Sequence, residues 1–289
     1  MLKRIAFIIN PISGTSDKKE LPKFIHDTFV EGWETVIVET QHAGHGSELA
    51  KQFSDEKYDV VVACGGDGTM NEVASALVHT DTAFAIVPYG SGNGLARHLG
   101  YSMDPKMAVA QIYKGTEHLI DSGLANGKRF FCTCGTGFDA HVSHAFTAEG
   151  KRGFFTYLKV ILREYLKYKP AEYTLTAPSF TLKKRAFLVT FANAAQWGNM
   201  AYIAPHASTR DGLLDITILH PFPVYLCVGL ALRLFRKTFD QSRYVTSLTT
   251  KEVTLSRESE GEFHIDGDPL MMGKEIKVEI DPLSLKVRV

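Results

Sequence analysis

Apolar and polar positions follow two different rhythms along the chain, and the change comes near residue 122. Before it, short apolar runs typical of buried strands alternate with stretches of helical periodicity. The predicted strands are Ile5–Ile9, Thr35–Glu39, Tyr58–Cys64 and Ala83–Val87, and the predicted helices are Leu21–Val30, Gly46–Phe53, Met70–Val78, Gly94–Leu99 and Pro105–Tyr113. This βαβ succession predicts a parallel sheet with helices on both faces.

Beyond residue 122 the pattern turns mostly to strands with short turns. These are Arg129–Cys134, Glu172–Thr176, Arg185–Ala192, Leu214–Leu219, Tyr244–Leu248, Glu252–Arg257, Glu262–Ile265 and Lys274–Ile280, interrupted by helical stretches at Phe154–Lys167 and Val224–Lys237. Such a series predicts a sheet packed on a sheet. The fold class is therefore α/β plus all-β: a Rossmann-like parallel-sheet domain over residues 1–122, then a β-sandwich over 123–282. The pattern of the last segment, 283–289, does not decide which domain it belongs to. We consider that it could join the first domain as a C-terminal strand.

Three polar, glycine-rich turns follow predicted strands of the first domain. They are Asn10–Gly14, the Gly-Gly-Asp-Gly-Thr run at 65–69, and Pro88–Gly94. Backbone N–H groups at a helix N-terminus favour phosphate. A carboxylate in such a turn suggests a metal ion or a proton transfer, so Asp67 points to phosphoryl transfer; a plain turn with Asp67 as a helix cap is the alternative. The chain has no Gly-x-x-x-x-Gly-Lys-Ser/Thr motif, and the Pro88–Gly94 turn fails the dinucleotide spacing because Leu95 stands where the third glycine would be.

Composition narrows the class of protein. The 289 residues suffice for two domains, and 45% hydrophobic with 22% charged residues is typical of a globular protein. The formal net charge is zero, which argues against a nucleic-acid partner. Four cysteines without a paired Cys-x-x-Cys spacing favour core packing over zinc and suit a reducing cytosol. A strand starting at Ile5 leaves no room for a signal peptide, and the longest apolar run, Phe222–Phe235, is too short to span a bilayer.

The motifs together carry a family resemblance. Asn10-Pro11-x-Ser13-Gly14, Gly65–Val73 and Pro88-x-Gly90-Ser91-Gly92-Asn93 resemble the three blocks of the diacylglycerol kinase catalytic domain, whose family includes bacterial lipid kinases and the sphingosine and ceramide kinases. Further blocks extend the resemblance over the whole chain: Thr40 with Gly44-His45-Gly46, then Gly135–Ala140, Lys151–Phe154, Ser208–Leu213 and His264–Asp268. Two departures stand out. Asp268 replaces the family's glutamate, and Gly-Ser-Gly-Asn-Gly at 90–94 is closer to the sphingosine and ceramide kinases, so the lipid headgroup stays open.

The resemblance implies a lipid kinase that uses ATP and Mg²⁺ to phosphorylate a hydroxyl of a neutral, diacylglycerol-like lipid or of a sphingoid base. The implied ATP-binding residues are Asn10, Pro11, Ile12, Ser13, Gly14, Thr40, Gly65, Gly66, Asp67, Gly68, Thr69, Met70, Asn71 and Ser91. Asp67 would act on the magnesium directly or through a water. The general base is Asp266 or Asp268, preferred to Asp67, although Asp266-Gly267 also suits a plain hairpin turn. Asp139 is the implied substrate residue, and Ser208, Asp211 and Leu213 the implied structural metal site.

The implied location is cytoplasmic and peripheral at the inner membrane surface, where the lipid substrate lies. Two segments interleave basic and aromatic residues, around residues 152–158 and 230–237. Either could be an interfacial helix, but core helices with basic edges are preferred. A homodimer is also considered. Two other functions stay open: an NAD kinase-like enzyme, which would share Gly65–Thr69, and a lipid- or nucleotide-binding regulator without catalysis.

Overall fold

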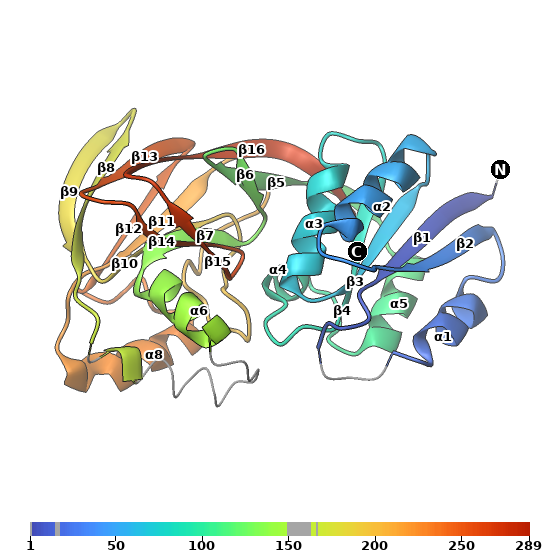
Figure 1. The fold of residues 1–289 in the computed structure, drawn as a ribbon, viewed down its shortest axis with the longest axis horizontal. Coiled ribbons are helices and arrows are strands. Elements are labelled where there is room, and N and C mark those ends of the chain that lie inside the picture. Colours follow the sequence, from blue (N-terminus) through green and yellow to red (C-terminus); the bar gives the residue numbers. More distant parts are fainter. Residues whose placement is uncertain (1, 15–17, 149–162, 166) are drawn as a thin grey trace. The chain divides into compact units, whose positions relative to one another are not determined.

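The computed structural model describes residues 2–14, 18–148, 163–165 and 167–289 (Figure 1). The chain divides into two compact units, unit 1 with Met1–Asp121 and Pro282–Val289, and unit 2 with Ser122–Asp281. Strands β5 (Glu117–Ala125) and β16 (Glu275–Arg288) carry the chain from one unit to the other. The predicted fold class, an α/β part followed by an all-β sandwich, is confirmed.

Unit 1 is a parallel sheet with helices on both faces. Its elements are β1 (Lys3–Ile9), α1 (Leu21–Thr28), β2 (Trp33–Glu39), α2 (His45–Asp55), β3 (Val60–Gly65), α3 (Asp67–Leu77), β4 (Ala83–Pro88), α4 (Gly94–His98) and α5 (Pro105–Lys114). The strand order is β2-β1-β3-β4, with Ile5 opposite Val60 and Val60 opposite Ala83. Strands β3 and β4 are buried along their whole length, as expected for a sheet covered on both sides. Helices α2 and α3 pack together on one face, and α1 and α5 on the other (Figure 1).

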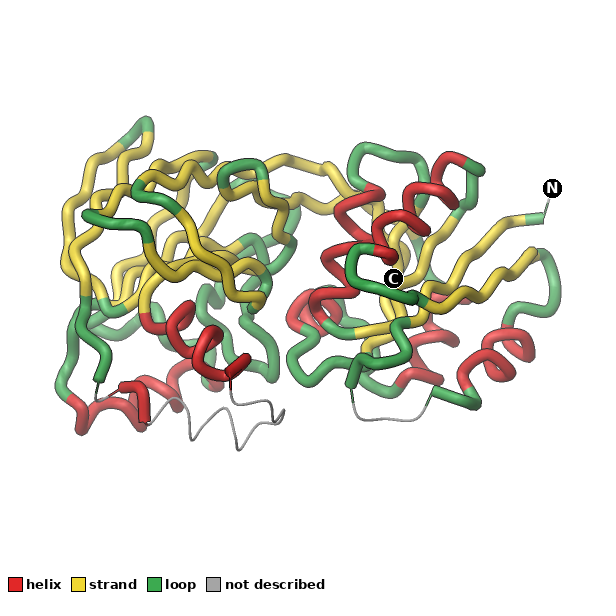
Figure 2. Tube along the Cα trace, in the orientation of Figure 1, coloured by secondary structure: helices red, strands yellow, loops and turns green. Residues whose placement is uncertain are grey.

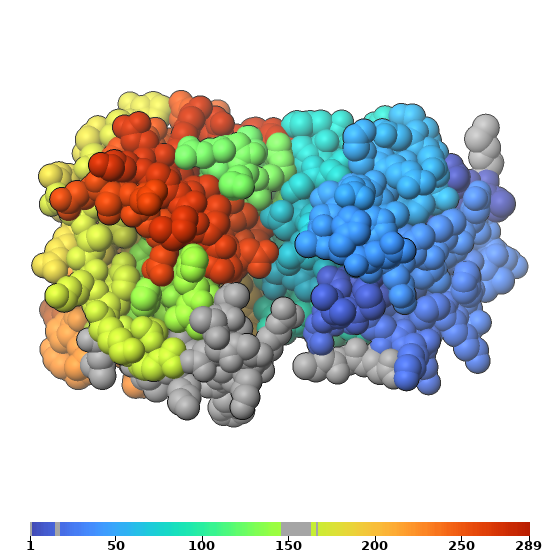
Figure 3. Space-filling model, viewed as in Figure 1, coloured from blue at the N-terminus to red at the C-terminus, as the bar shows by residue number. Residues whose placement is uncertain are grey.

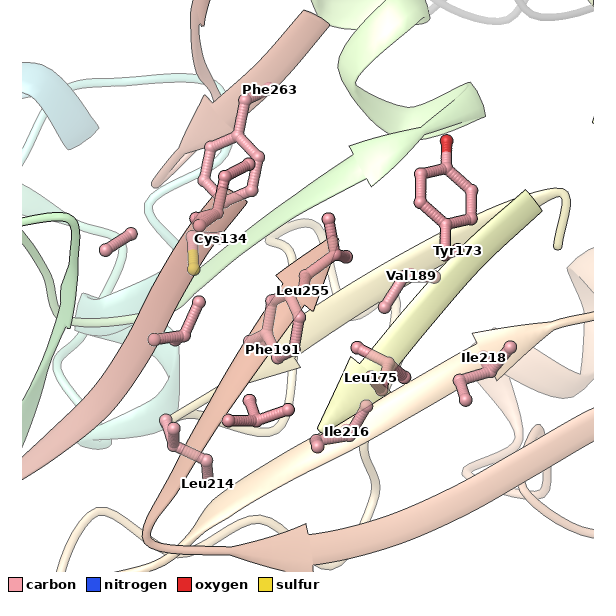
Figure 4. Close-up of a cluster of buried hydrophobic side chains, with 14 of the residues drawn as sticks. Cys134, Tyr173, Leu175, Val189, Phe191, Leu214, Ile216, Ile218, Leu255 and Phe263 are labelled. Atoms are coloured by element: carbon pink, nitrogen blue, oxygen red, sulfur yellow. The ribbon is translucent and has the colours of Figure 1, made fainter. Parts of the chain in front are cut away.

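Unit 2 is an antiparallel sandwich. Its elements are β6 (Lys128–Phe130), β7 (Thr133–Gly137), α6 (Phe138–Ala148), β8 (Ala171–Ala177), β9 (Phe180–Ala186), β10 (Leu188–Ala192), β11 (Leu214–Leu219), η1 (Val224–Leu226), α8 (Cys227–Phe235), β12 (Val245–Thr250), β13 (Glu252–Arg257), β14 (Gly261–Ile265) and β15 (Asp268–Met272). One sheet has the order β16-β13-β8-β9 and the other β12-β11-β10-β7-β14-β15. Apolar side chains from both sheets, including Leu175, Phe191, Leu255 and Phe263, fill the space between them (Figure 4). Helices α6 and α8 lie at one end of this unit (Figure 2).

The C-terminal segment is the second half of a fourteen-residue strand, β16. Early in β16, Val278 pairs with Val253 of β13, and near its end Val287 pairs with Phe84 of β4. The predicted strand Lys274–Ile280 is therefore only part of a longer one, and the segment after it returns to unit 1.

Some strand boundaries differ from the prediction for identifiable reasons. Strand β5 was not predicted because polar residues interrupt its apolar pattern, yet Asp121 and Ser122 are both fully buried. Asp121 accepts a hydrogen bond from the Leu283 N–H at 2.7 Å, which satisfies it inside the protein. The predicted strands Arg129–Cys134 and Arg185–Ala192 are each divided, into β6 and β7 and into β9 and β10.

The two predicted helices of the second part have different outcomes. Most of Phe154–Lys167 lies outside the described residues. Val224–Lys237 is the short turn η1 followed by α8, which ends at Phe235. Within the part of the chain that the structure describes, no helix is both long and apolar enough to cross a membrane.

The four cysteines all lie in the described ranges and form no disulfide. Burial raises the pKa of the Cys64 and Cys134 thiols, so both stay protonated at neutral pH. Cys134 belongs to the sandwich core (Figure 4), in agreement with the predicted packing role.

Candidate active site

The three glycine-rich turns of unit 1 lie side by side, because β1, β3 and β4 are parallel neighbours. The Asn10 N–H donates to the Cys64 carbonyl at 3.0 Å, and the Tyr89 N–H to the Gly65 carbonyl at 2.8 Å. The Asn10 side chain also donates to Thr69 Oγ1 at 2.9 Å, which ties the first turn to the start of α3. The turns therefore form one polar surface at the carboxyl edge of the sheet, where open parallel sheets bind their ligands.

These turns pack so closely that only glycine fits at two of their contacts. Gly14 has a φ of +68°, and a Cβ there would lie 1.8 Å from the Tyr89 carbonyl oxygen. A Cβ on Gly90 would lie 2.8 Å from the Gly66 Cα and 2.6 Å from Asn93 Oδ1. The surface is consequently bare backbone at the N-terminus of α3, where unpaired N–H groups suit a phosphate group.

Asp67 begins α3 and connects it to the next turn. Its Oδ2 accepts from the Asn93 N–H at 3.0 Å and its Oδ1 from the Gly94 N–H at 2.9 Å. Asn93 and Gly94 start α4, so the carboxylate caps the neighbouring helix rather than its own. The capping alternative is thus partly correct, but the same bonds hold a half-buried carboxylate in a fixed place beside the bare backbone. A metal-binding or catalytic carboxylate needs such support.

Glu72 holds the segment after β2 in place. Its carboxylate accepts from the Gly44 N–H at 2.9 Å and the Gly46 N–H at 3.2 Å. The Ser47 hydroxyl donates to the Glu72 carbonyl at 2.8 Å. Thr40, at the other end of the segment, donates its N–H to the carbonyl of the last β1 residue at 2.9 Å. The Thr40 region is thereby anchored at the same edge of the sheet as the glycine-rich turns.

A second polar group, at the start of α2, consists of His42, His45 and Glu48, whose nitrogen and oxygen atoms lie within 4.8 Å of one another. The two imidazole rings are stacked, with centroids 4.7 Å apart and planes 20° from parallel. Imidazole lone pairs lie in the ring plane, so stacked rings do not point at a common ion. His45 Nδ1 also accepts from the Gln41 N–H at 3.0 Å, which places its proton on Nε2. This arrangement does not present converging metal ligands.

In unit 2, the Asp-Gly pair between β14 and β15 forms a tight hairpin turn, with φ of +48° at Asp266 and +90° at Gly267. The Asp266 carboxylate accepts three backbone N–H groups, from Phe131 at 2.9 Å, Cys132 at 2.8 Å and Thr133 at 3.1 Å. Asp266 therefore holds the loop before β7. Two residues on, Asp268 is exposed at the first position of β15.

Asp139, in the first turn of α6, is almost buried at 8% exposure. Its Oδ2 accepts from Thr190 Oγ1 at 2.9 Å and lies 3.0 Å from His264 Nε2. His264 is 3% exposed, and its Nδ1 has no hydrogen-bond partner among the described residues. Asp139 thus orients a buried imidazole on the strand that leads to Asp266.

The predicted metal turn precedes β11. The Arg210 N–H donates to Ser208 Oγ at 3.3 Å, and the Leu213 N–H to Asp211 Oδ1 at 3.0 Å. Burial, with a further contribution from the nearby Asp211 charge, raises the pKa of Asp215 to about 6, while His206 acts in the opposite direction. Neighbouring carboxylates offer oxygen ligands of the kind that a hard cation prefers.

Comparison with known proteins accounts for both units. Residues 4–125 match the family model of the diacylglycerol kinase catalytic domain, and residues 132–289 match the YegS C-terminal NAD kinase beta sandwich-like domain. The chain belongs to the diacylglycerol kinase-like family of lipid kinases. The predicted family and the predicted kinase class of enzyme are thereby confirmed.

Relatives of this lipid kinase cover almost its whole length. It is 30% identical over 264 residues to a probable lipid kinase YegS-like of Pseudomonas aeruginosa (strain PAO1), covering 89% of this chain and 85% of the relative. It is 26% identical over 275 residues to the diacylglycerol kinase of Bacillus subtilis (strain 168), covering 92% and 90%. A solved structure described as a diacylglycerol kinase from Bacillus anthracis str. Sterne superposes with a TM-score of 0.77 at 20% identity, covering 99% of this chain and 96% of that one, which supports the fold.

Two basic side chains of the lipid kinase, Lys18 and Arg97, also lie at the glycine-rich turns. The sequence patterns gave neither of them a role. The Lys18 ammonium donates to the Ser13 carbonyl and lies 4.6 Å from the centre of the Tyr89 ring. Arg97 Nε donates to the Gly92 carbonyl at 3.1 Å. Both hydrogen bonds are local, five residues apart in the chain, whereas the contact of Lys18 with the Tyr89 ring joins two separate turns. The block at Lys151–Phe154 lies outside the described residues.

Proposed function

We propose that this lipid kinase transfers the γ-phosphate of ATP, with Mg²⁺, to a hydroxyl of a neutral lipid or sphingoid base. The meeting of three glycine-rich turns at the start of α3 carries the proposal. Bare backbone at Gly14, Gly66 and Gly90 suits the phosphates, and Asp67 suits the metal. When bound, Mg²⁺ would neutralise phosphate charge during transfer.

The remaining side chains of unit 1 would serve binding and charge balance. Asn10, Ser13, Thr40 and Ser91 supply polar groups along the turns, and the N–H groups from Gly68 to Asn71 open α3. Lys18 and Arg97 supply positive charge next to the same turns. These cations would favour the negative charge that develops on the transferred group. Glu72 acts by holding the Gly44–Gly46 backbone in place.

For the proton acceptor we propose Asp268 rather than Asp266. Asp266 already accepts three backbone N–H groups, so its charge is committed to the loop before β7. Asp268 is exposed at the first position of the following strand, β15. A general base must reach the substrate hydroxyl within hydrogen-bond distance, which an exposed carboxylate allows. Asp67 remains the alternative base.

Two further assignments follow the same reasoning. Asp139 was predicted to touch the substrate; its bonds to Thr190 and His264 favour a positioning role behind the Asp266 hairpin. Ser208, Asp211 and Leu213 are proposed to hold a structural magnesium, with Asp215 beside them. Cytoplasmic, peripheral action at the membrane and a homodimer remain proposals for this chain.

Radiolabelled ATP, offered with NAD, diacylglycerol, sphingosine and ceramide in mixed micelles, tests the proposal. Label in one or more lipids, dependent on Mg²⁺, is expected. The second matched domain is described as NAD kinase-like, which makes NAD the relevant competitor. Label in NAD alone would replace the lipid proposal with that alternative. Omitting Mg²⁺ is the matched control, and undiminished labelling without it would contradict the metal dependence.

A further inference from the structure

An apolar stripe runs along the exposed face of η1 and α8 in unit 2. Val224, Tyr225, Val228, Leu232 and Phe235 are all large, apolar and exposed, with Tyr225 at 76% and Val228 at 71%. Their spacing of about four residues places most of them on one side of the helix. Among the described residues, this segment holds five of the thirteen exposed large hydrophobics. Single exposed apolar residues are ordinary, whereas a contiguous stripe marks an interaction surface.

The opposite side of α8 is packed into unit 2, so the stripe belongs to a firmly held helix. Leu230 is buried in a cluster with Phe138 and Phe187, and Leu234 packs against the same cluster. The Tyr202 N–H donates to the Leu234 carbonyl at 3.0 Å. The helix is therefore held on unit 2 by its inner side, and its segment of the chain is drawn in orange in Figure 3.

The charge of this segment is all of one sign. No Asp or Glu occurs between Asp215 and Asp240, whereas Arg233 lies in the last turn of α8 and Arg236 and Lys237 directly follow the helix. Arg236 and Lys237 are exposed, and Lys237 Nζ lies 4.4 Å from the centre of the Tyr202 ring. Apolar side chains bordered by basic ones are the pattern of an interfacial helix that meets anionic lipid headgroups.

We propose that the outer face of η1 and α8 is the surface by which this kinase docks on an anionic membrane. The inference rests on the proposed function, because a substrate dissolved in water would require no such surface. The stripe enters the boundary between headgroups and acyl chains, and Arg236 and Lys237 meet lipid phosphates. A second copy of the chain fits less well, because this segment contains no acid to meet the partner's basic residues.

Vesicle sedimentation tests the docking surface directly. The double variant Val228→Glu with Leu232→Glu should bind vesicles of phosphatidylcholine with phosphatidylglycerol at least about tenfold more weakly, since two apolar side chains no longer leave water. The matched control is Val30→Glu with Met107→Glu, two exposed apolar residues of unit 1, with Val30 at the same 71% exposure as Val228. This control should bind as the wild type does. Arg236→Gln with Lys237→Gln should reduce the preference for anionic over pure phosphatidylcholine vesicles.

Activity on two forms of substrate separates docking from catalysis. With a short-chain diacylglycerol in detergent micelles, the Val228/Leu232 variant should retain wild-type activity, and it should lose activity only on vesicles. Equal vesicle binding by this variant and the wild type would overturn the docking proposal. If the variant also changed from dimer to monomer in light scattering, the stripe would instead be an interface between two copies of the chain. If the wild type docks through this face but labels no dispersed lipid, the proposed function fails while docking stands.

Discussion

At the scale of single residues, two aspartates of one short turn have different surroundings. Asp266 and Asp268 flank a glycine and look equivalent in the sequence. The structure gives Asp266 three backbone N–H donors from residues more than 130 positions earlier, and leaves Asp268 exposed. Replacing a carboxylate that accepts several backbone N–H groups leaves some of them without a partner. We therefore expect substitution of Asp266 to lower stability and substitution of Asp268 to lower the turnover rate.

Asp268→Asn should lower kcat by about a hundredfold or more, the usual scale for a general base, without changing the thermal midpoint. Asp266→Asn should instead lower the free energy of unfolding by about 1–3 kcal/mol, because the amide keeps only one acceptor oxygen and its NH2 group cannot accept the N–H groups bonded to the other. The rate of lipid phosphorylation measures the change in kcat of both variants, and thermal unfolding measures the change in their stability. Full activity in Asp268→Asn would move the base to Asp67.

Gly90 offers a second test at this scale. In Gly90→Ala the new methyl group would lie 2.8 Å from the Gly66 Cα, so the turns must separate. We expect a loss of stability of about 1–3 kcal/mol together with weaker ATP binding. In the control, Gly229→Ala in α8, the new Cβ meets no atom within 4 Å. That variant should gain about 0.5–1 kcal/mol, since alanine favours a helix. Equal stability of the two variants in chemical denaturation would show that the turns are loosely packed.

At the scale of elements, β16 is the strand whose two halves belong to different units. Its end is secured by Arg288, which donates to the carbonyls of Ile112 at 2.8 Å and Tyr113 at 3.1 Å. Those carbonyls lie in the last turn of α5, where the Ile112 carbonyl also accepts from the Gly115 N–H at 3.2 Å. The Arg288 carbonyl accepts from the Tyr101 hydroxyl at 2.5 Å. One side chain thus connects the C-terminal strand to a helix of unit 1.

Arg288→Gln should therefore destabilise the protein by about 1–3 kcal/mol, because the buried Ile112 carbonyl and the partly buried Tyr113 carbonyl lose a charged donor. The neighbouring Lys286→Gln, whose ammonium bonds an exposed carbonyl, should change the unfolding free energy by less than about 0.5 kcal/mol. Urea denaturation of both variants measures the difference. Identical midpoints would mean that pairing of β16 with β4 suffices without the Arg288 contacts.

At the scale of the whole molecule, the proposed sites are divided between the two units. The glycine-rich turns belong to unit 1, while the Asp266 hairpin, the Ser208–Leu213 turn and the apolar stripe belong to unit 2. Each unit has its own core, so each supplies preformed parts of the proposed activity. Ligands that bind the folded chain stabilise it by mass action, which makes melting temperature a measure of each proposed site.

Mg²⁺ without ATP should raise the melting temperature of the wild type through the Ser208–Leu213 turn. At a Mg²⁺ concentration of about a hundred times its Kd for this site, binding would stabilise the folded state by about 2.7 kcal/mol. Asp211→Asn should lose most of this increment, whereas Asp81→Asn, an exposed residue of unit 1, should keep it. Calorimetry with and without the ion compares the three proteins. The same increment in Asp211→Asn as in the wild type would reduce this turn to an ordinary loop.

The element types, the glycine-rich turns and the family could be predicted from the sequence, because periodicity and turn chemistry are local properties of the chain. The contacts that these parts make depend on the folded structure. Asp266 bonds to residues 131–133, Glu72 to the Gly44 region, and β16 divides its pairing between two units. The buried polar residue Asp121 likewise obscured the pattern of β5, since a partner distant in the chain compensates it. Contacts across such separations depend on the packing of whole sheets, which no local pattern encodes.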